Sequence, residues 1–422
     1  MKDETLCLRA GYHPKNSEPA VMPIVQSTTY VYDSTEEVAA VFDDPTRSLI
    51  YSRFANPTVM AVEEKISELE GGVGAMCTTS GQAATMLSLL NILSAGDSFL
   101  ASTEIYGGTV NLFHVTFKRL GIECISVTPE MSDEEIEGLI KPNTKAFFGE
   151  TIANPALAVF DIERYAAIAH KHGIPLIIDN TFATPILCKP FKFGADIIVH
   201  STSKYMDGHA LQNGGVIIDG GTFDWTNGKF PDLTEPDESY HGISYTKAYG
   251  KAAYIIKARM QLMRDFGVYP AAHSAFLLNI GLETLAVRMK QYCENAMTVA
   301  EFLMKQPMVS RVIYPGLPGD KYHELAKKYL PDGTSGVISF VVKGGKEKAM
   351  KWMNSLSMCS NEVHVADIRT CVLHPASETH RQLSEEQLKE AGIEPGMIRL
   401  SVGLENLSDI ISDLEGAFKA IS

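Results

Sequence analysis

The chain has 422 residues, of which 45% are hydrophobic and 21% are charged. That composition excludes a disordered chain and predicts a globular protein with about two or three domains. The 37 basic and 51 acidic residues give a net charge of −14, which argues against a surface for nucleic acid or anionic membrane and favours a small-molecule partner.

The seven cysteines include no CxxC pair and are too sparse to cross-link so long a chain, so we expect them to be reduced. The first seven residues lack the apolar core of a signal peptide, and no later stretch reaches the apolar length of a membrane span. These features predict a cytoplasmic location.

The chain begins with a stretch, residues 1–57, that carries proline and paired tyrosines but few periodic patterns, and we expect it to form an N-terminal arm. A helix is predicted to begin at Pro57 and to run to Glu70, because apolar side chains recur at helical spacing and two glycines then interrupt the pattern. The apolar positions are Val59, Val62, Ile66 and Leu69.

A turn of small residues from Thr78 to Ala84 opens the next predicted helix, and a helix start that contains serine and glycine can bind an anion. Strand and helix patterns alternate beyond it, with Asp161 to His172 as one of the helices. The predicted strands are 98–102, 123–127, 145–150, 176–179, 196–200 and 216–219. This alternation predicts an α/β fold with a mostly parallel, doubly wound sheet, in a large domain of residues 58–268.

Longer helices are predicted over 271–306 and strands near 337–342 and 398–402, which indicates a separate C-terminal α+β domain of residues 269–422. Within the large domain, the stretch 220–241 has little regular period but carries four aromatic residues. We expect an ordered excursion there. If it lies over the entrance to a site, it would shield reactive intermediates from water.

Two predicted strands end in residues that together suggest a cofactor. The run Ile197 to Val199 leads through hydroxyl-bearing residues to Lys204, and the run 176–178 ends in Asp179. Taken singly, the lysine would more often be a surface charge and the aspartate a helix cap. A lysine that can form a Schiff base, beside an anion that can keep a pyridine nitrogen protonated, suggests pyridoxal 5'-phosphate.

Further motifs follow one another in order along the chain. They are Tyr51-Ser52-Arg53, Asn56-Pro57-Thr58, Ser80 to Ala84, Tyr106 to Thr109, Asn154-Pro155, Asp179-Asn180-Thr181, Ser201 to Tyr205, His374-Pro375-Ala376 and Ile398 to Gly403. With these motifs, nearly the whole chain resembles the pyridoxal-phosphate enzymes of cysteine and methionine metabolism. The resemblance implies the aspartate-aminotransferase-like fold, fold type I.

The resemblance implies three catalytic residues. Lys204 would form the Schiff base and, once displaced by a substrate amine, move protons between carbon atoms. Asp179 would pair with the pyridinium nitrogen, and Tyr106 would stack on the ring. Without the resemblance, Tyr106 would as readily be an ordinary core aromatic.

Other residues are assigned to the cofactor in the same way. The phosphate would be held by the amides of Gly81 and Gln82, at a helix start, and by the hydroxyls of Ser201 and Ser203. Asn154 would donate a hydrogen bond to the phenolic oxygen of the cofactor.

A third group of residues is implied at the phosphate and at the substrate. Tyr51 and Arg53 resemble a phosphate clamp that reaches in from a neighbouring subunit, and Tyr51 would also contact the substrate. Arg399 would bind the substrate carboxylate, with Thr370 nearby. By strand alternation, Arg399 faces away from whatever Ile398 and Leu400 bury.

Within the family, Gln82 and the segment 230–241 resemble the O-acetylhomoserine sulfhydrylases, whereas methionine γ-lyases carry a cysteine at the place of Gly108. The segment His364 to Thr370 departs from the Asn-Val-Gly-Asp-like string expected there. Because that segment lies near the substrate carboxylate in relatives, it bears on substrate choice.

The resemblance implies γ-replacement in methionine and cysteine biosynthesis: O-acetyl-L-homoserine and sulfide give L-homocysteine and acetate. The alternatives are a methionine or cystathionine γ-lyase of the same family and a non-catalytic binding protein on this fold. The expected partners are an amino-acid substrate and sulfide, with neither nucleic acid nor membrane, in a homotetramer with shared sites. No metal is expected, because the spacing of His241, His374 and His380 matches no zinc pattern.

Overall fold

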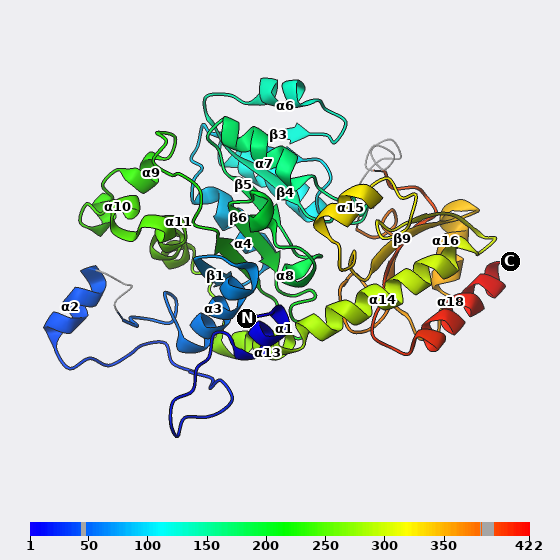
Figure 1. The fold of residues 1–422 in the computed structure, drawn as a ribbon, viewed down its shortest axis with the longest axis horizontal. Coiled ribbons are helices and arrows are strands. Elements are labelled where there is room, and N and C mark those ends of the chain that lie inside the picture. The colour runs from blue at the N-terminus through cyan, green and yellow to red at the C-terminus, as the bar shows by residue number, and fades with distance from the viewer. Residues whose placement is uncertain (44–47, 380, 382–391) are drawn as a thin grey trace.

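The computed structural model describes residues 1–43, 48–379, 381 and 392–422. Two β-sheets organise the described chain, as Figure 1 shows. The strands of the larger sheet are β1 Gly74–Thr78, β2 Ser98–Ser102, β3 Glu123–Val127, β4 Thr144–Glu150, β5 Leu176–Asp179, β6 Ile197–Ser201 and β7 Gly215–Asp219. The strands of the smaller sheet are β8 Val309–Ile313, β9 Val337–Val342, β10 Ser360–Asn361, β11 Cys371–Leu373 and β12 Met397–Ser401.

The larger sheet has the order β1-β7-β6-β5-β4-β2-β3. Its strands from β2 to β6 pair in parallel, whereas β7 runs antiparallel to both β6 and β1. The carboxyl ends of β4, β5 and β6 therefore meet at one edge, where ligands bind in open α/β sheets. The prediction of a mostly parallel α/β sheet is confirmed.

Both faces of this sheet are covered, because its central strands are apolar on both sides. Ile178 and Ile198 belong to a core that includes α3 and α7, whereas Ile177 belongs to a second core that includes α4 and α11. The helices of the larger part are α3 Pro57–Glu70, α4 Gly81–Leu90, α5 Gly107–Asn111, α6 Asp133–Leu139, α7 Ile162–Lys171, α8 Thr184–Leu187, α9 Pro231–Thr234, α10 Tyr245–Tyr249, α11 Ala253–Lys257 and α12 Arg264–Phe266.

Helix α3 begins and ends at the predicted residues, Pro57 and Glu70. The side chain of Asn56 accepts a hydrogen bond from Thr58 N, and Pro57 occupies the first turn, where its missing N–H costs nothing. Gly71 ends the helix in the left-handed region, with φ of 84°.

The long helix α14, Leu285–Met304, connects the two sheets: it contacts α1 and α8 at one end and β8 and β9 at the other (Figure 1). It follows α13, Ala272–Glu283, so the helical region predicted over 271–306 is two helices. The other α-helices of this part, among the described residues, are α15 His323–Tyr329, α16 Gly345–Met353 and α18 Leu407–Ile421. The predicted domain boundaries at residues 57/58 and 268/269 stay predictions.

The N-terminal residues form two short helices, α1 Asp3–Arg9 and α2 Thr35–Asp43, which the sequence pattern did not predict. Between them the chain is mostly irregular and carries exposed apolar side chains, among them Val21 and Val31. Figure 1 shows α2 at the margin of the molecule.

The segment 220–241 is ordered, as expected. Trp225 and Phe230 are buried in the core that includes α4 and α11. Asn227 donates to the carbonyl of Gly173, just before β5, and Lys229 contacts Thr144, the first residue of β4. The segment therefore lies at the amino ends of the strands, away from the edge where β4, β5 and β6 end, so in the single chain it does not lie where it could shield a site at that edge.

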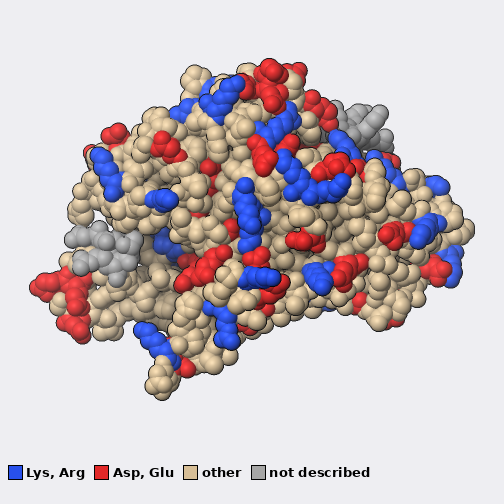
Figure 2. Space-filling model, in the orientation of Figure 1, with Lys and Arg blue, Asp and Glu red and all other residues tan. Residues whose placement is uncertain are grey.

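Acidic and basic side chains are interspersed on the face of the molecule shown in Figure 2. Among the described residues, no helix is long and apolar enough to span a membrane.

Candidate active site

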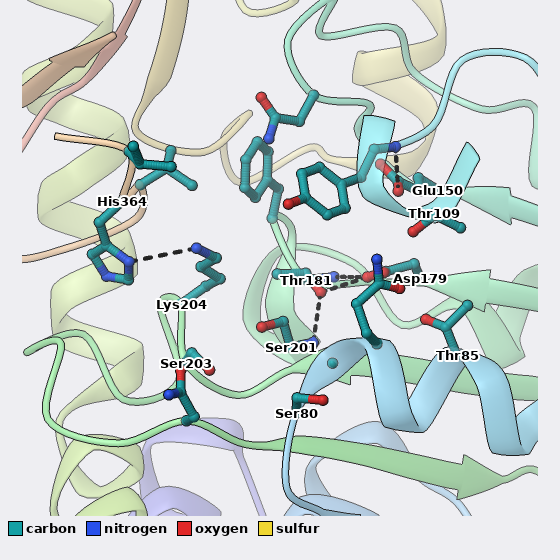
Figure 3. Close-up of a pocket in the computed structure, with 18 of the residues that line it drawn as sticks. Ser80, Thr85, Thr109, Glu150, Asp179, Thr181, Ser201, Ser203, Lys204 and His364 are labelled. Atoms are coloured by element: carbon teal, nitrogen blue, oxygen red, sulfur yellow. Dashed lines mark hydrogen bonds between the residues drawn. The ribbon is translucent and has the colours of Figure 1, made fainter. Parts of the chain in front are cut away.

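A cavity of about 420 Å³ opens at the carboxyl ends of β4, β5 and β6 (Figure 3). The larger sheet and α4 form one wall, and the segment 363–365 and Arg399 of the C-terminal part contribute to the opposite one. Nine of the twelve predicted site residues line it: Gly81, Gln82, Tyr106, Asn154, Asp179, Ser201, Ser203, Lys204 and Arg399.

Lys204 follows β6 and extends its amine into this cavity. Burial and, to a smaller extent, the nearby guanidinium of Arg399 together lower the pKa of the amine from 10.5 to about 8. About a tenth of the amine is therefore uncharged at pH 7, far more than for an ordinary lysine. An uncharged amine is the form that attacks an aldehyde carbon.

Asp179 ends β5 and is held in place by its neighbour. Its Oδ1 atom accepts hydrogen bonds from both the amide and the hydroxyl of Thr181, and the Thr181 hydroxyl in turn accepts from the amide of Ser201 (2.9 Å). Burial raises the pKa of Asp179, and the bonds from Thr181 together with the charge of His200 oppose that rise. The carboxylate is thus aimed into the cavity by a short chain of bonds across two strand ends.

A second buried carboxyl group, Glu150, ends β4 and lines the same cavity. Its Oε1 atom accepts the backbone N–H of Tyr106 at 2.7 Å. Burial raises the pKa of Glu150 well above its ordinary value, and the charge of Asp179 raises it further. Ionisation of both adjacent carboxyl groups is unfavourable, because the two negative charges repel each other. Because Asp179 has two donors in Thr181, Asp179 carries the charge and Glu150 keeps its proton.

The first turn of α4 provides an anion site beside Lys204. Ser80 caps the helix by accepting the amide of Ala83 (3.1 Å), while the amides of Gly81 and Gln82 belong to the turn whose N–H groups have no partner within the helix. A Cβ atom on Gly81 would lie 2.6 Å from Cβ of Ser201. Only glycine lets the helix start approach β6 so closely.

Tyr106 precedes α5 and is 46% exposed in the single chain, so its ring is available for stacking. A Cβ atom on Gly108 would lie 2.5 Å from the Tyr106 ring and 2.7 Å from Nε2 of Gln82. The glycine at position 108 therefore leaves space that these two side chains occupy. Oε1 of Gln82 is buried and has no hydrogen-bond partner among the described residues.

Arg399 crosses from β12 to the cavity and is 4% exposed. One terminal nitrogen, Nη1, donates to Oδ1 of Asn154 (3.3 Å), and the other, Nη2, donates to the carbonyls of Val363 and His364. Its Nε atom is buried and has no partner within the described chain. A carboxylate could supply the missing acceptor.

His364 was not predicted as a site residue, yet its Nδ1 atom lies 3.4 Å from Nζ of Lys204 (Figure 3). The two residues are 160 positions apart, so no local pattern reveals the contact. Glu150 was also missed, although it ends a predicted strand beside the one that ends in Asp179.

Three predicted residues do not line the cavity. Thr370 is fully buried outside the cavity lining, where its hydroxyl donates to Glu405 (2.7 Å) and accepts the amide of Gly403 (2.9 Å), so that hydroxyl is already engaged. Tyr51 is 39% exposed, and the guanidinium carbon of Arg53 lies 5.4 Å from the centre of its ring. Tyr51 and Arg53 thus form a pair outside the cavity of their own chain.

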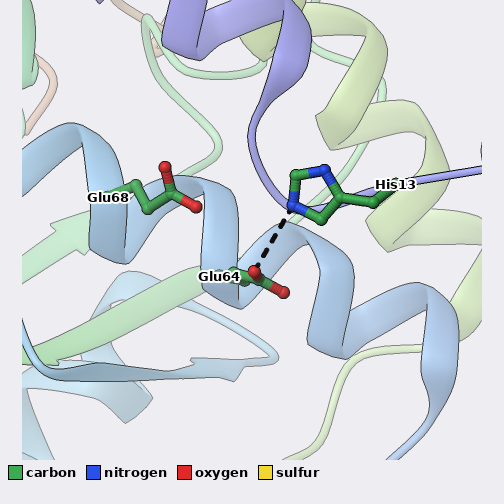
Figure 4. A group of neighbouring side chains, drawn as sticks. All are labelled: His13, Glu64 and Glu68. Atoms are coloured by element: carbon green, nitrogen blue, oxygen red, sulfur yellow. Dashed lines mark ion pairs between the residues drawn. The ribbon is translucent and has the colours of Figure 1, made fainter. Parts of the chain in front are cut away.

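Of the histidines considered for a metal, His374 has other partners. His374 accepts the amide of Ser377 and bonds the carbonyl of Pro395, and His380 lies outside the described residues. His13, Glu64 and Glu68 bring possible ligand atoms within 4.8 Å of one another (Figure 4). All three are exposed, and nothing else at this surface indicates a metal.

The cavity fits pyridoxal phosphate. It combines a free helix start with a glycine that a side chain could not replace, an amine of lowered pKa and a buried carboxylate. Gly81, Gln82, Ser201 and Ser203 would hold the phosphate. Asp179 would face the ring nitrogen, and Lys204 the aldehyde.

The comparison with known proteins decides the family. A family model described as "Cys/Met metabolism PLP-dependent enzyme" matches residues 4–419. The chain belongs to this family. It is 44% identical to O-acetyl-L-homoserine sulfhydrylase of Leptospira meyeri, over 100% of this chain and 97% of the relative. It is 42% identical to O-acetyl-L-homoserine sulfhydrylase 1 of Thermus thermophilus, over 99% and 100%.

Solved structures show the same architecture. A putative O-acetylhomoserine (thiol)-lyase from Campylobacter jejuni superposes with a TM-score of 0.95 at 38% identity, over 99% of this chain and 100% of that one, and it carries N'-pyridoxyl-lysine-5'-monophosphate. The metB protein of Corynebacterium glutamicum superposes with a TM-score of 0.85 at 31% identity, over 100% and 99%. The predicted family, fold type I and dependence on pyridoxal phosphate are confirmed.

Proposed function

We propose that this protein catalyses γ-replacement, in which O-acetyl-L-homoserine and sulfide give L-homocysteine and acetate. The observation that carries the proposal is the arrangement of Lys204, Asp179 and Arg399 around one cavity, in a chain 44% identical over its whole length to a sulfhydrylase of this name. The arrangement provides an attacking amine, an anion and a carboxylate clamp.

Each of the three residues has a separate task. Arg399 binds the carboxylate of the amino-acid substrate through its unpartnered Nε and neighbouring N–H groups. Lys204, with its pKa near 8, removes protons from the substrate carbons and returns them. When bound, pyridoxal phosphate accepts the electrons of the carbanions at the α and β carbons. Asp179 keeps a negative charge beside the ring nitrogen.

Loss of acetate from the γ carbon distinguishes this substrate class. Acetate is a stable anion, so once electrons are available at the β carbon it can leave the γ carbon without being protonated. The site would then hold the unsaturated remainder of the substrate until sulfide adds to the γ carbon. Gly108 supports replacement over a γ-lyase, because the sequence resemblance places a cysteine there in methionine γ-lyases and the Tyr106 and Gln82 side chains fill that space here.

We further propose a homotetramer in which Tyr51 and Arg53 complete the phosphate site of a neighbouring chain. Support comes from their place outside their own cavity and from the exposed apolar side chains of the arm. The cytoplasmic location expected from the sequence stays a prediction.

The experiment is a product assay with purified protein, pyridoxal phosphate and O-acetyl-L-homoserine, with and without sulfide. We expect sulfide-dependent homocysteine from the wild-type protein and none from Lys204→Ala, in which circular dichroism should show an unchanged fold. Homocysteine formation by Lys204→Ala would contradict the assignment of the amine.

A further inference from the structure

The amine of Lys204 has a hydrogen-bond partner on the opposite wall of the cavity, the side chain of His364. Nδ1 of His364 lies 3.4 Å from Nζ of Lys204, and the dashed line in Figure 3 marks this contact. The imidazole is 22% exposed, so it also reaches the water of the cavity.

The other ring nitrogen, Nε2, faces an acid. It lies 3.7 Å from Oδ2 of Asp367, which is 1% exposed. Asp367 is itself fixed by Arg369, whose Nε donates to Oδ1 at 2.7 Å and whose Nη2 donates to Oδ2 at 3.0 Å. Nε2 has no hydrogen-bond partner among the described residues, so Asp367 acts on it through its charge. A negative charge on that side favours the tautomer with the proton on Nε2, which leaves the lone pair of Nδ1 directed at Lys204.

Hydrogen bonds also fix the backbone at and just after His364. Its carbonyl accepts Nη2 of Arg399 at 3.0 Å, and the amide of Ala366 donates to the hydroxyl of Ser401 at 2.8 Å. Val365 and Ala366, which follow His364 in the chain, are both buried. The position of the imidazole is therefore set by the smaller sheet, whereas Lys204 belongs to the larger one.

The charged groups around His364 favour a neutral ring. Burial lowers the pKa of His364, and the charges of Lys204 and Arg399 lower it further, against the opposing charges of Asp367 and Glu362. A neutral imidazole can accept a proton, whereas an imidazolium cannot.

We propose that His364, oriented by Asp367, is the proton acceptor of Lys204: it takes the ammonium proton from Nζ and passes it to the water of the cavity. This inference rests on the proposed function, since it presumes that Lys204 attaches the cofactor. Attachment forms a C=N bond to Nζ, and the aldehyde oxygen leaves as water with the two protons of the neutral amine. The third proton, which makes the amine an ammonium group, goes through Nδ1 of His364 to solvent.

The role is confined to a range of pH. Below the Lys204 pKa of about 8 most of the amine is protonated and needs an acceptor, whereas well above it the amine is already free. His364 should therefore accelerate attachment near neutral pH and make little difference in alkaline solution.

The test follows the attachment of pyridoxal phosphate to the full chain after its cofactor has been removed. The absorbance of the bound cofactor gives the rate, and borohydride reduction with mass spectrometry identifies the residue modified. At about pH 6.5, His364→Ala should react at least roughly tenfold more slowly than the wild type, and at about pH 9 within roughly twofold of it, since the Lys204 amine is then free. Added imidazole should restore the rate at the lower pH.

Two further variants separate proton transfer from structure. His364→Asn keeps a polar side chain in place, so it should be slow at the lower pH and resist rescue because the space is filled. The control is His114→Ala. His114 is exposed and does not line the cavity, so this variant should attach the cofactor at the wild-type rate at both pH values. Equal rates for His364→Ala and the wild type at the lower pH, or a slow rate at both pH values without rescue by imidazole, would overturn the inference. Absence of any adduct on wild-type Lys204 would overturn the proposed function, and this inference with it.

Discussion

Glu150 and Asp179 lie in register on the neighbouring parallel strands β4 and β5, so two buried carboxyl groups end adjacent strands at the same cavity. Asp179 is bonded to Thr181, and Glu150 accepts the backbone N–H of Tyr106. The pair therefore connects Asp179, which we propose faces the cofactor nitrogen, with the residue that holds the backbone of Tyr106.

Glu150→Gln tests the protonation of this pair. Because Glu150 already carries a proton, glutamine should preserve both its charge and its acceptor for Tyr106 N, and cofactor affinity should stay within roughly threefold of the wild type. Glu150→Ala removes the acceptor and should weaken binding by about 1–3 kcal/mol. Titration with pyridoxal phosphate measures both. Equal weakening in the two variants would show that Glu150 acts as an anion.

Asp179→Asn is the matched change on the neighbouring strand. Here the charge itself is required, so the variant should keep some cofactor but lose most of its turnover rate, since a neutral amide cannot hold the pyridinium proton. Steady-state kinetics on the cofactor-saturated variant would check this. A near-normal rate would assign the task to another group.

Gly81→Ala tests the close approach of α4 and β6. The added Cβ would lie 2.8 Å from Cα of Ser201, a backbone atom that cannot move freely. Overpacking of this kind costs about 1–3 kcal/mol, which corresponds to a roughly 5- to 150-fold loss of cofactor affinity if the helix start is displaced. Gly138→Ala in α6, where nothing lies within 4 Å of the added atom, is the control and should bind normally. Unchanged affinity in Gly81→Ala would remove the helix start from the phosphate site.

The sequence predicted correctly that several residues at strand ends line one cavity, because the carboxyl ends of parallel strands meet at one edge of the sheet. Asp179, Ser201 and Lys204 follow apolar runs that are unmistakable in sequence. Glu150 obeys the same rule and could have been predicted with it. His364 could not, because only the packing of the smaller sheet brings it to Lys204.

Closeness in sequence to other site residues does not ensure that a residue reaches the cavity. Thr370 lies six residues beyond His364 but turns its hydroxyl to Glu405. Strand β1, Gly74–Thr78, was missed since Gly, Ala, Met and Cys have weak strand propensity, and its place beside β7 depends on long-range pairing. The segment 220–241 was correctly expected to be ordered, but nothing local indicates which edge of the sheet it covers.

The lowered pKa of Lys204 predicts how the reactivity of its amine changes with pH. Because its pKa is lowered to about 8, modification by acetic anhydride in the cofactor-free protein should rise with pH with a midpoint near that value, well below the 10.5 of an ordinary lysine. Arg399→Ala should move the midpoint upward, since the guanidinium lowers the pKa. Mass spectrometry of the Lys204 peptide measures both, with the cofactor-loaded protein as the protected control. A midpoint above 10 would contradict the buried, partly neutral amine.

Shared sites can be tested by mixing two inactive variants. Arg53→Ala lacks the proposed clamp and Lys204→Ala lacks the amine. If the clamp is donated by a partner chain, random exchange should restore about a quarter of wild-type activity, because about half the pairs are hybrid and one of their two sites is intact. No recovery after exchange has been verified by native mass spectrometry would place Arg53 at the site of its own chain.

The most direct test of the central claim is the balance of products. With O-acetyl-L-homoserine and sulfide, the protein should release acetate and form homocysteine in equal amounts, and with methionine alone it should yield little 2-oxobutanoate. Both follow from a site that holds the substrate until sulfide adds. Rapid formation of 2-oxobutanoate from methionine, without sulfide-dependent homocysteine, would contradict γ-replacement and identify a γ-lyase.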